Sequence, residues 1–333
     1  MEKTLFINSI PGDSFTYKEL RLALEEKGYA LSIAHFPQSD TPSILAACRG
    51  CCGVICNGEA WDRAAIDAVK GHARIFVRHG VGVDSIDAEY AAACGIPLYN
   101  VGDANASAVA EVALFHILGA LRKCAYAANE AKAGRAYNIG NFFGHELSGK
   151  TVGLIGAGNI GRRLARMLRG FEVTLLAFDP FVDPALAAQA GITLVSSMDE
   201  VFRRADVVSL HIPCTLSTKG SIGRALFNQM KPGACLVNTC RGGVINEADL
   251  LDGLQKGLPC AAGLDVVMSE PVRPEDPLCR RENVTVTPHI GANSFESIGR
   301  YAAAIADTVE GFFSGRPCGN LLNPAYLRHS GGN

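Results

Sequence analysis

The 333-residue sequence has no apolar run approaching the ~18 residues of a membrane-spanning helix, so we expect no membrane partner. It also has almost no net charge, and the formal value of −2 gives no electrostatic basis for binding nucleic acid or anionic lipid. Low-complexity segments are absent, and the first residues read as a short apolar strand rather than a signal peptide. With 48% hydrophobic and 19% charged residues, the composition is that of a globular α/β protein large enough for two domains, which we expect to be cytoplasmic.

Cysteine, in contrast, is abundant, with twelve residues. Four of them crowd one stretch, namely Cys48, Cys51, Cys52 and Cys56. The thiol count alone allows a metal or iron–sulfur site. Residues 54–56, however, read as a buried strand that alternates its side chains between two faces, and cysteine is often buried without a special role. We therefore predict no metal site and keep a metal centre as the alternative; disulfides are not expected in a reducing compartment.

The most informative stretch covers residues 151–179. An apolar run enters a turn that reads Gly156-Ala157-Gly158-Asn159-Ile160-Gly161, and a helical pattern and a second apolar run follow, ending at Asp179. The last glycine and the acid are 179 − 161 = 18 positions apart. This order of strand, glycine turn, helix, strand and acid, with a spacing close to ~20, is the fingerprint of a dinucleotide-binding βαβ unit.

Each residue type in this fingerprint has a physical task. Gly156 allows the tight turn, Gly158 lets the backbone approach a pyrophosphate, and Gly161 lets helix and strand pack closely. The pyrophosphate would lie at the positive N-terminal end of the helix. Asp179 would accept hydrogen bonds from the adenosine ribose hydroxyls and repel a 2′-phosphate. The stretch therefore predicts NAD rather than NADP as the cofactor.

The organisation of the whole chain predicts two doubly wound α/β domains with parallel sheets and a cleft between them. Strands are expected at residues 5–8, 31–35, 54–56, 74–78 and 96–99, and a long helix at 106–133. After the fingerprint, further strands are expected at 207–211, 235–238, 261–264 and 284–287, and a last helix at 295–313. The last helix favours a first domain built from both chain ends. We predict a substrate domain of residues 1–102 and 292–333 and a Rossmann nucleotide-binding domain of residues 103–291.

Three predicted strands of the second domain are followed by polar residues, at the sheet edge where open α/β sheets bind ligands. Arg241 offers a fork-shaped cation for a substrate carboxylate. His289 can give a proton to a carbonyl oxygen as hydride reaches the carbon, and Glu270 can orient that imidazole and favour its charged form. Asp265 either binds the nicotinamide carboxamide or tunes Glu270. Together these residues predict hydride transfer between NAD and a 2-keto acid.

These motifs resemble those of the D-isomer-specific 2-hydroxyacid dehydrogenase family, which includes D-3-phosphoglycerate dehydrogenase and glyoxylate/hydroxypyruvate reductase. The likeness runs through almost the whole chain. Besides the fingerprint and the segments of Arg241, Glu270 and His289, the matching motifs are residues 78–84, 105–111, 146–151, 211–213 and 230–233. The resemblance implies a flavodoxin-like substrate domain, D stereochemistry and a homodimer whose core is the helix starting near Ala106.

The resemblance also assigns site residues. Backbone amides of Gly80, Val81 and Gly82 would help to bind the substrate carboxylate. The residues that would line the NAD site are Val81, Asn159, Ile160, His211, Ile212, Pro213, Thr239, Cys240 and Asp265. Cys240 stands where a small residue is expected, so its thiol is either sensitive to oxidation or, as we favour, buried and inert.

Substrate choice depends on the loop after residues 54–56, which reads Asn57-Gly58-Glu59-Ala60. Phosphoglycerate dehydrogenases similar to this chain have an arginine there to meet the phosphate, whereas this loop offers none and Glu59 would repel an anion. With Asn57 as a substrate contact, the loop predicts a small unphosphorylated 2-keto acid.

Other functions stay open at this stage. D-3-phosphoglycerate dehydrogenase is the first alternative. Formate oxidation is disfavoured, because formate dehydrogenases pair the histidine with glutamine rather than Glu270, whereas phosphite oxidation is compatible with the three polar residues. An NAD-sensing corepressor of the same fold is the alternative outside enzymes. Four arginines on the fingerprint helix (Arg162, Arg163, Arg166 and Arg169) could meet nucleic acid or a 2′-phosphate, but on one helix they favour a solvated face.

Overall fold

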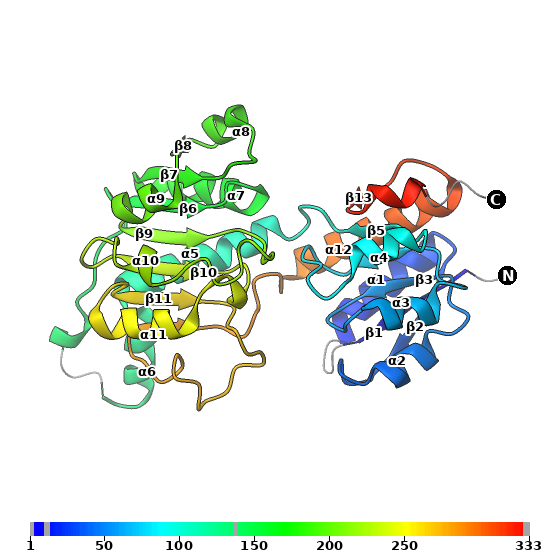
Figure 1. Ribbon diagram of the computed structural model, residues 1–333. Coiled ribbons are helices and arrows are strands. Elements are labelled where there is room, and N and C mark those ends of the chain that lie inside the picture. Colours follow the sequence, from blue (N-terminus) through cyan, green and yellow to red (C-terminus); the bar gives the residue numbers. More distant parts are fainter. Residues whose placement is uncertain (1–2, 10–13, 136–138, 329–333) are drawn as a thin grey trace. The chain divides into compact units, whose positions relative to one another are not determined.

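The computed structural model describes residues 3–9, 14–135 and 139–328. The chain forms two compact units (Figure 1). Unit 1 comprises Met1–Asn105 together with Asn293–Asn333, and unit 2 comprises Ala106–Ala292.

Unit 1 is built on a six-stranded sheet in the order β13-β5-β4-β3-β1-β2. Its strands are β1 (Thr4–Asn8), β2 (Ala30–Ala34), β3 (Gly53–Cys56), β4 (Phe76–Arg78), β5 (Leu98–Asn100) and β13 (Asn320–Leu321). The first five are parallel, and β13 pairs antiparallel with β5. The parallel strands follow the order 2-1-3-4-5 of flavodoxin-like sheets, whose ligands bind beyond the carboxyl ends at the β1/β3 switch point.

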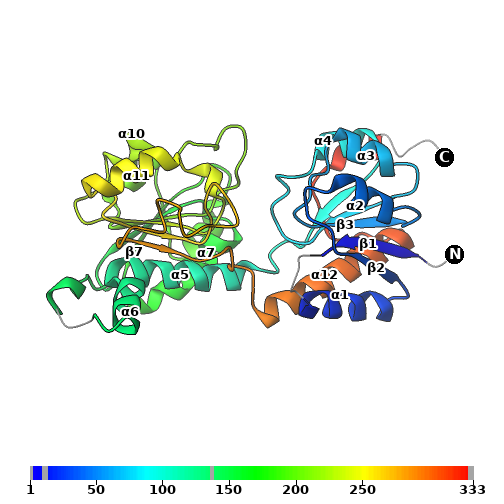
Figure 2. The same ribbon diagram turned by 90° about the horizontal axis from the view of Figure 1, so that it is seen from below.

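Helices cover both faces of this sheet (Figure 2). One face carries α2 (Thr41–Ala47), α3 (Arg63–Val69) and α4 (Ala88–Ala93), and the other carries α1 (Ser14–Glu26) and α12 (Phe295–Ser314). The side chain of Ser294 caps the start of α12, and Gly315 ends it in the left-handed conformation. Lys27, just after α1, forms ion pairs with Asp307 and Glu310 of α12. Both ends of the chain therefore contribute to unit 1. Its last described element is η4 (Pro324–Arg328).

Unit 2 contains a seven-stranded parallel sheet in the order β12-β11-β10-β9-β6-β7-β8. Its strands are β6 (Thr151–Ile155), β7 (Thr174–Phe178), β8 (Thr193–Leu194), β9 (Val207–Leu210), β10 (Cys235–Asn238), β11 (Ala261–Leu264) and β12 (Val284–Val286). Counted within the unit this is 3-2-1-4-5-6-7, the dinucleotide-binding order extended by one strand. The central strands are buried on both faces, which explains their continuous apolar runs.

Two hydrophobic cores lie on the two faces of this sheet. One contains buried side chains of α5 (Ala106–Arg122), α7 (Asn159–Leu168) and α8 (Pro184–Gln189). The other contains those of α9 (Met198–Arg204), α10 (Arg224–Phe227) and α11 (Glu247–Lys256). Figure 2 shows α5 and α7 on the side of the sheet opposite to α10 and α11. The remaining helical segments are α6 (Cys124–Lys132), η1 (Ile139–Phe142), η2 (Arg169–Phe171) and η3 (Gly242–Val244).

The predicted fold class, two parallel-sheet α/β domains, is confirmed. The helical segment predicted over residues 106–133 is present but divided into two helices, since α5 ends at Arg122 and α6 starts at Cys124. Between them Lys123 has φ 54°, which a continuous right-handed helix does not allow. The short β8 and β13, of two residues each, were not predicted because so few residues show no periodicity.

The cysteine-rich stretch is part of the core of unit 1. Cys48, Cys51 and Cys56 are buried, and burial raises the pKa of the Cys48 thiol to about 12. Within the described residues, no three His, Cys, Asp or Glu side chains are grouped so that they could hold a metal ion. Among all the residues that the structure describes, no helix is long and apolar enough to span a membrane.

Candidate active site

The glycine turn of unit 2 connects the end of β6 to α7 and can be built only from glycines at two positions. Gly156 has φ 99°, and a Cβ on it would lie 2.5 Å from the carbonyl oxygen of His211. A Cβ on Gly161 would lie 2.4 Å from the carbonyl oxygen of Gly156. Both distances are below van der Waals contact with backbone that cannot move aside. The turn is therefore tight, and α7 packs directly against it.

Asp179, at the end of β7, ties this turn to the next one. Its Oδ2 accepts the amide hydrogen of Ala157 at 2.8 Å. Its Oδ1 accepts the amide hydrogens of Phe181 and Val182 at 2.8 and 3.1 Å. A carboxylate offers about four acceptor positions, so the half-buried Asp179 keeps acceptor capacity for a ribose hydroxyl.

The N-terminus of α7 suits a phosphate group. Gly158 is the N-cap and provides no side-chain hydrogen bond to the first amides of the helix. Arg162 folds back onto the turn, where it donates to the carbonyl of Ala157 and to Oδ1 of Asn159, both at 2.8 Å. The other three arginines of this stretch are exposed, in agreement with the solvated face expected there. Together with the glycine cradle, these features fit the pyrophosphate of a dinucleotide.

The segments after β9 and β10 flank the turn. His211 follows β9, contacts Ser209 Oγ through its Nε2 at 2.9 Å, and has a pKa lowered to about 4 by burial. Thr239 follows β10, and its buried Oγ1 has no hydrogen-bond partner among the described residues. A buried hydroxyl without a partner is costly, which suits a bound ligand at this edge. Burial raises the pKa of Cys240 to about 11, which favours an inert thiol over an oxidation-sensitive one.

Arg241 is presented by a rigid loop after β10. The buried Asn238 donates from Nδ2 to the Arg241 carbonyl at 2.8 Å and accepts the Cys240 amide hydrogen at 3.0 Å. The guanidinium Nη1 donates to the Cys240 carbonyl at 2.7 Å. A Cβ on the next residue, Gly242, would lie 2.1 Å from the backbone of Val267, so the loops after β10 and β11 are in direct contact.

His289 and Glu270 form the predicted pair. The Nδ1 atom of His289 lies 2.7 Å from Oε2 of Glu270, and the two side chains are 47% and 37% exposed. Partial burial raises the pKa of Glu270. The hydrogen bond to His289 and the positive charges of His289 and Arg241 outweigh this effect, so the pKa of Glu270 lies below its usual value. Glu270 is therefore ionised at neutral pH, and Nε2 is the ring nitrogen left for a ligand.

Asp265 organises the segment that carries His289. Its buried carboxylate accepts hydrogen bonds from Thr287 Oγ1 at 2.6 Å and from the amides of Ile290 and Gly291 at 2.9 and 2.8 Å. Its carbonyl accepts the amide hydrogen of His289 at 2.9 Å. His289 itself has φ 55°, an uncommon conformation that these bonds maintain. A contact of Asp265 with nicotinamide stays a prediction.

His116, which no sequence motif singled out, belongs to the same network. This histidine lies fully buried in the middle of α5, with Nε2 2.8 Å from Thr287 Oγ1. The hydroxyl of Thr287 donates its hydrogen to Asp265, so the Thr287 oxygen must accept a hydrogen from His116. His116 is therefore the neutral tautomer with its hydrogen on Nε2. A single imidazole on an otherwise apolar helix face is the signal that could have revealed it.

We predict a pH dependence of stability from His116. Burial, opposed in part by the charge of Asp265, lowers its pKa to about 4, against roughly 6.5 when the chain is unfolded. Between these values the unfolded state binds more protons, so the free energy of unfolding decreases as pH falls from about 6.5 to 4, by roughly 3 kcal/mol. In His116→Leu the decrease in the free energy of unfolding that His116 causes should be absent, and only the similar decrease caused by His211 should remain. Urea unfolding at several pH values checks this, and equal slopes in both proteins would contradict it.

In unit 1, the loop Gly80–Gly82 follows β4 and is fixed through its carbonyl groups. The carbonyl of Gly80 accepts a hydrogen bond from the Val101 amide at 3.3 Å. The carbonyl of Val81 accepts one from Asn100 Nδ2, and that of Gly82 accepts one from Arg78 Nε, both at 2.8 Å. The amide of Gly80 donates to the Arg78 carbonyl at 2.9 Å. The amides of Val81 and Gly82 are thus the better placed of the three predicted anion donors.

The loop after β3 corrects one expectation from the sequence. Glu59 is only 2% exposed, and its Oε1 accepts hydrogen bonds from Trp61 Nε1 and the Asn57 amide, both at 3.0 Å. Its carboxylate thus points into the unit and does not present a charge on the loop surface. Asn57 is also buried, and its Nδ2 donates to the carbonyl of Asn8 and to the hydroxyl of Tyr17.

Comparison with known proteins places these observations in a family. Residues 114–291, more than half of the chain, match the model of "D-isomer specific 2-hydroxyacid dehydrogenase, NAD binding domain". The chain is 38% identical over 262 residues to a D-3-phosphoglycerate dehydrogenase of Archaeoglobus fulgidus, which covers 79% of this chain and 49% of the relative. The chain spans about half the length of the curated relatives it matches.

Solved structures resemble the whole chain. A glyoxylate reductase from Paecilomyes thermophila is 28% identical with a TM-score of 0.83, covering 96% of this chain and 98% of that one. The NAD⁺-bound 3-phosphoglycerate dehydrogenase of Entamoeba histolytica is 25% identical with a TM-score of 0.78, covering 94% and 96%. The resemblance seen in the sequence is thereby confirmed. The chain belongs to the D-isomer specific 2-hydroxyacid dehydrogenase family, and residues 114–291 are its NAD-binding domain.

Proposed function

We propose that this chain transfers a hydride between NAD and a small, unphosphorylated 2-keto or D-2-hydroxy acid. The observation that carries the proposal is the 2.7 Å contact between His289 Nδ1 and Glu270 Oε2, at the sheet edge that also bears Arg241. A histidine oriented by a carboxylate beside a guanidinium is the arrangement that reduction of a keto acid needs.

The proposed mechanism assigns one task to each of these side chains. NAD, when bound, supplies or accepts the hydride. Arg241 binds the substrate carboxylate with its planar fork and so orients the carbonyl group. His289 gives its Nε2 proton to the carbonyl oxygen during reduction and takes it back during oxidation. Glu270, ionised because its pKa is lowered, holds the imidazole through Nδ1 and stabilises its charged form.

The residues proposed to hold NAD surround the turn between β6 and α7. Gly156, Gly158 and Gly161 form the cradle, and the amides of Asn159 and Ile160 begin the helix that faces the pyrophosphate. We propose further contacts from His211, Ile212, Pro213, Thr239, Cys240 and Asp265, all of unit 2, and we keep Val81 of unit 1 as a predicted contact. The Thr239 hydroxyl, which lacks a partner in the described residues, supports a polar contact there.

Asp179 is predicted to select NAD. In Asp179→Asn the amide oxygen can keep the bonds from the Phe181 and Val182 amides, whereas the bond from the Ala157 amide is lost and the charge facing a 2′-phosphate is gone. We expect the ratio of kcat/KM for NADH to that for NADPH to fall by about 30-fold, the equivalent of roughly 2 kcal/mol of repulsion. Initial rates with both cofactors measure the ratio, with Asp183→Asn at the next turn as the control. An unchanged ratio would show that Asp179 does not select the cofactor.

The preference for an unphosphorylated substrate rests on the loop after β3. Residues 57–60 contain no cation for a phosphate, and the buried Asn57 offers a neutral lining. Since Glu59 points inward, the missing arginine, rather than repulsion by Glu59, supports this choice. The names of the curated relatives favour D-3-phosphoglycerate dehydrogenase as the second candidate.

A screen of NADH oxidation with a dozen 2-keto acids decides between the two candidates. We expect kcat/KM for glyoxylate, hydroxypyruvate or pyruvate to exceed that for 3-phosphohydroxypyruvate by at least tenfold. A higher value for the phosphorylated acid would establish the second candidate instead. Tight NADH binding without turnover of any acid would contradict both and indicate a binding protein.

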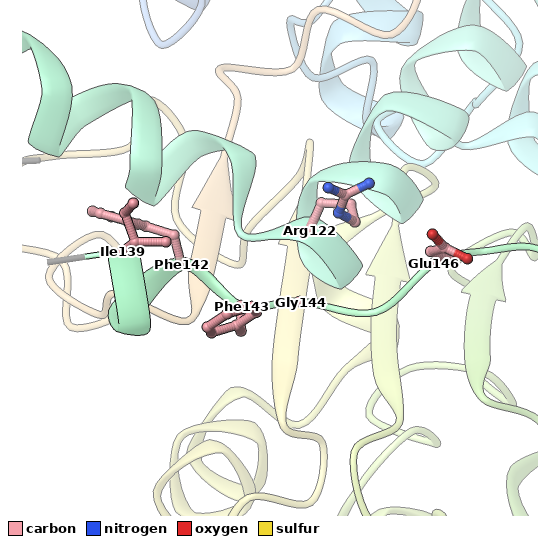
Figure 3. A pocket seen from close by; sticks show the side chains of 6 residues that line it. All are labelled: Arg122, Ile139, Phe142, Phe143, Gly144 and Glu146. Atoms are coloured by element: carbon pink, nitrogen blue, oxygen red, sulfur yellow. The ribbon is translucent and has the colours of Figure 1, made fainter.

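We further propose a homodimer, formed through α5 and the segment that follows it. Ile139, Phe142 and Phe143, together with Arg122 and Glu146, line a cavity of about 310 Å³, and Figure 3 shows these side chains along the segment that passes α5. Ile139 and Phe143 are 73% and 75% exposed, an apolar surface that favours a partner. Sedimentation of Phe143→Ser against Phe181→Ser, which changes a phenylalanine that is 94% exposed on another surface, tests this site.

A cytoplasmic location is proposed as well, since all twelve cysteines are free thiols.

A further inference from the structure

Two thiols of unit 2 lie side by side at the sheet edge opposite to the candidate active site. Cys235 is the first residue of β10, and Cys260 precedes β11, the neighbouring strand. Their sulfur atoms are 3.7 Å apart, and Cys260 Sγ donates to the Gly233 carbonyl at 3.0 Å. The pair therefore lies at the beginning of two adjacent paired strands, and the sulfurs need to approach by less than 2 Å to reach the ~2.05 Å of a disulfide bond.

The surroundings make Cys260 the nucleophilic member of the pair. Cys235 is 1% exposed, whereas Cys260 is half-buried, and both line a cavity of about 750 Å³ that Lys123, Tyr126 and His145 also line. The hydrogen bond from Cys235, opposed by burial and aided by the Lys123 ammonium, lowers the pKa of Cys260. A partly exposed thiol beside a cation is the usual setting of a reactive cysteine. Cys48 and Cys240, in contrast, have their pKa raised by burial.

We propose that Cys235 and Cys260 form a dithiol site that hydroperoxides oxidise to an intramolecular disulfide. In the first step the Cys260 thiolate attacks the peroxide; the O–O bond breaks, a sulfenic acid forms and hydroxide leaves. In the second step the Cys235 thiol attacks the Cys260 sulfur, the S–O bond breaks and water leaves. The hydroxide takes up the proton that Cys260 released on forming its thiolate, so overall two thiols are oxidised and one hydrogen peroxide is reduced to two waters.

The bond would join β10 to the residue before β11 at their amino-terminal ends. Arg241 and Asp265 follow the carboxyl-terminal ends of the same two strands, so the disulfide would leave the candidate active site in place. It would close a loop of about 25 residues, which restricts the unfolded chain. We therefore expect oxidation to raise the melting temperature by a few degrees while NADH binding changes less than twofold.

The experiment treats the full-length protein with a small excess of hydrogen peroxide, followed by alkylation, digestion and mass spectrometry. The expected product is a pair of peptides joined through Cys235 and Cys260, two hydrogens lighter than their sum and separated again by dithiothreitol. Cys279→Ser, which removes an exposed cysteine elsewhere in unit 2, should form the same product. Cys260→Ser and Cys235→Ala should lose both the product and the rise in melting temperature.

A second probe does not depend on oxidation. Phenylarsine oxide bridges two neighbouring thiols. One equivalent should therefore bind to the wild type and to Cys279→Ser and remain bound when a monothiol is added in excess. That equivalent should be lost in Cys260→Ser, which alters a half-buried position and is the variant that should fold most readily. Recovery of Cys260 as free thiol after Cys279 has been oxidised would overturn the proposal, as would conversion of Cys260 to a sulfinic acid without the linked peptides.

Discussion

Replacing His289 by asparagine should lower kcat for reduction of the best keto acid by about a thousandfold, because the reaction loses its proton donor. Asparagine suits this position, since it tolerates the left-handed backbone conformation of His289 better than most residues and can still contact Glu270. The variant should keep the Kd for NADH within about twofold. Stopped-flow or steady-state absorbance at saturating NADH measures kcat, and fluorescence titration measures the Kd.

Glu270→Gln is the matched control for this variant. The amide keeps a hydrogen bond to His289 Nδ1 but removes the charge that favours the imidazolium. We expect a loss in kcat of about 10- to 100-fold, clearly smaller than that of His289→Asn. If His289→Asn kept more than a tenth of the wild-type kcat, another group would be the proton donor and the proposed mechanism would be wrong.

Arg241→Met should lower kcat/KM by about a thousandfold, mainly through a higher KM for the keto acid. Methionine fills a similar volume but lacks the two charge-assisted hydrogen bonds that a carboxylate receives, each contributing about 2 kcal/mol. Arg241→Lys retains a charge without the planar fork and should recover only part of the loss. Kinetics at fixed saturating NADH provides both constants.

The loop around Arg241 offers an internal check on this result. Apart from the guanidinium bond to the Cys240 carbonyl, the bonds that fix it run through Asn238 to the backbone, so Arg241→Met should leave the loop and the melting temperature nearly unchanged. A large loss of stability would mean that the kinetic defect reflects a disordered loop. A KM for the keto acid equal to that of the wild type would remove Arg241 from the substrate-binding role.

Much of this architecture could be predicted from sequence, because the decisive signals are local. The spacing of Gly156, Gly161 and Asp179 follows from the geometry of one βαβ unit. The carboxyl ends of parallel strands share one edge, so residues placed just after them, such as Arg241 and His289, were expected to gather there. Glu270 was expected beside His289, and the two are in contact.

What could not be predicted depends on contacts between distant segments. The hydrogen bond of His116 to Thr287 joins residues 171 positions apart, and no local pattern encodes it. The inward orientation of Glu59 depends on Trp61 and on the packing of unit 1. The break at Lys123 is a change of one dihedral angle within a pattern that is compatible with helix on both sides.

The cysteines show the same limit. The sequence drew attention to the crowded stretch from Cys48 to Cys56 and to Cys240, since these are neighbours in the chain or near a motif. Burial raises the pKa of those thiols, whereas Cys235 and Cys260, separated by 25 positions, meet through the pairing of β10 with β11.

The close approach of Gly242 to the backbone of Val267 has a consequence for redesign of the substrate range. With no space between these loops, Arg241 and the segment leading to Glu270 form a single block whose spacing cannot be altered one residue at a time. Libraries that randomise position 242 should yield mostly inactive clones. Diversity is better directed to Ala60, an exposed position of the loop after β3 that takes no part in the proposed carboxylate site.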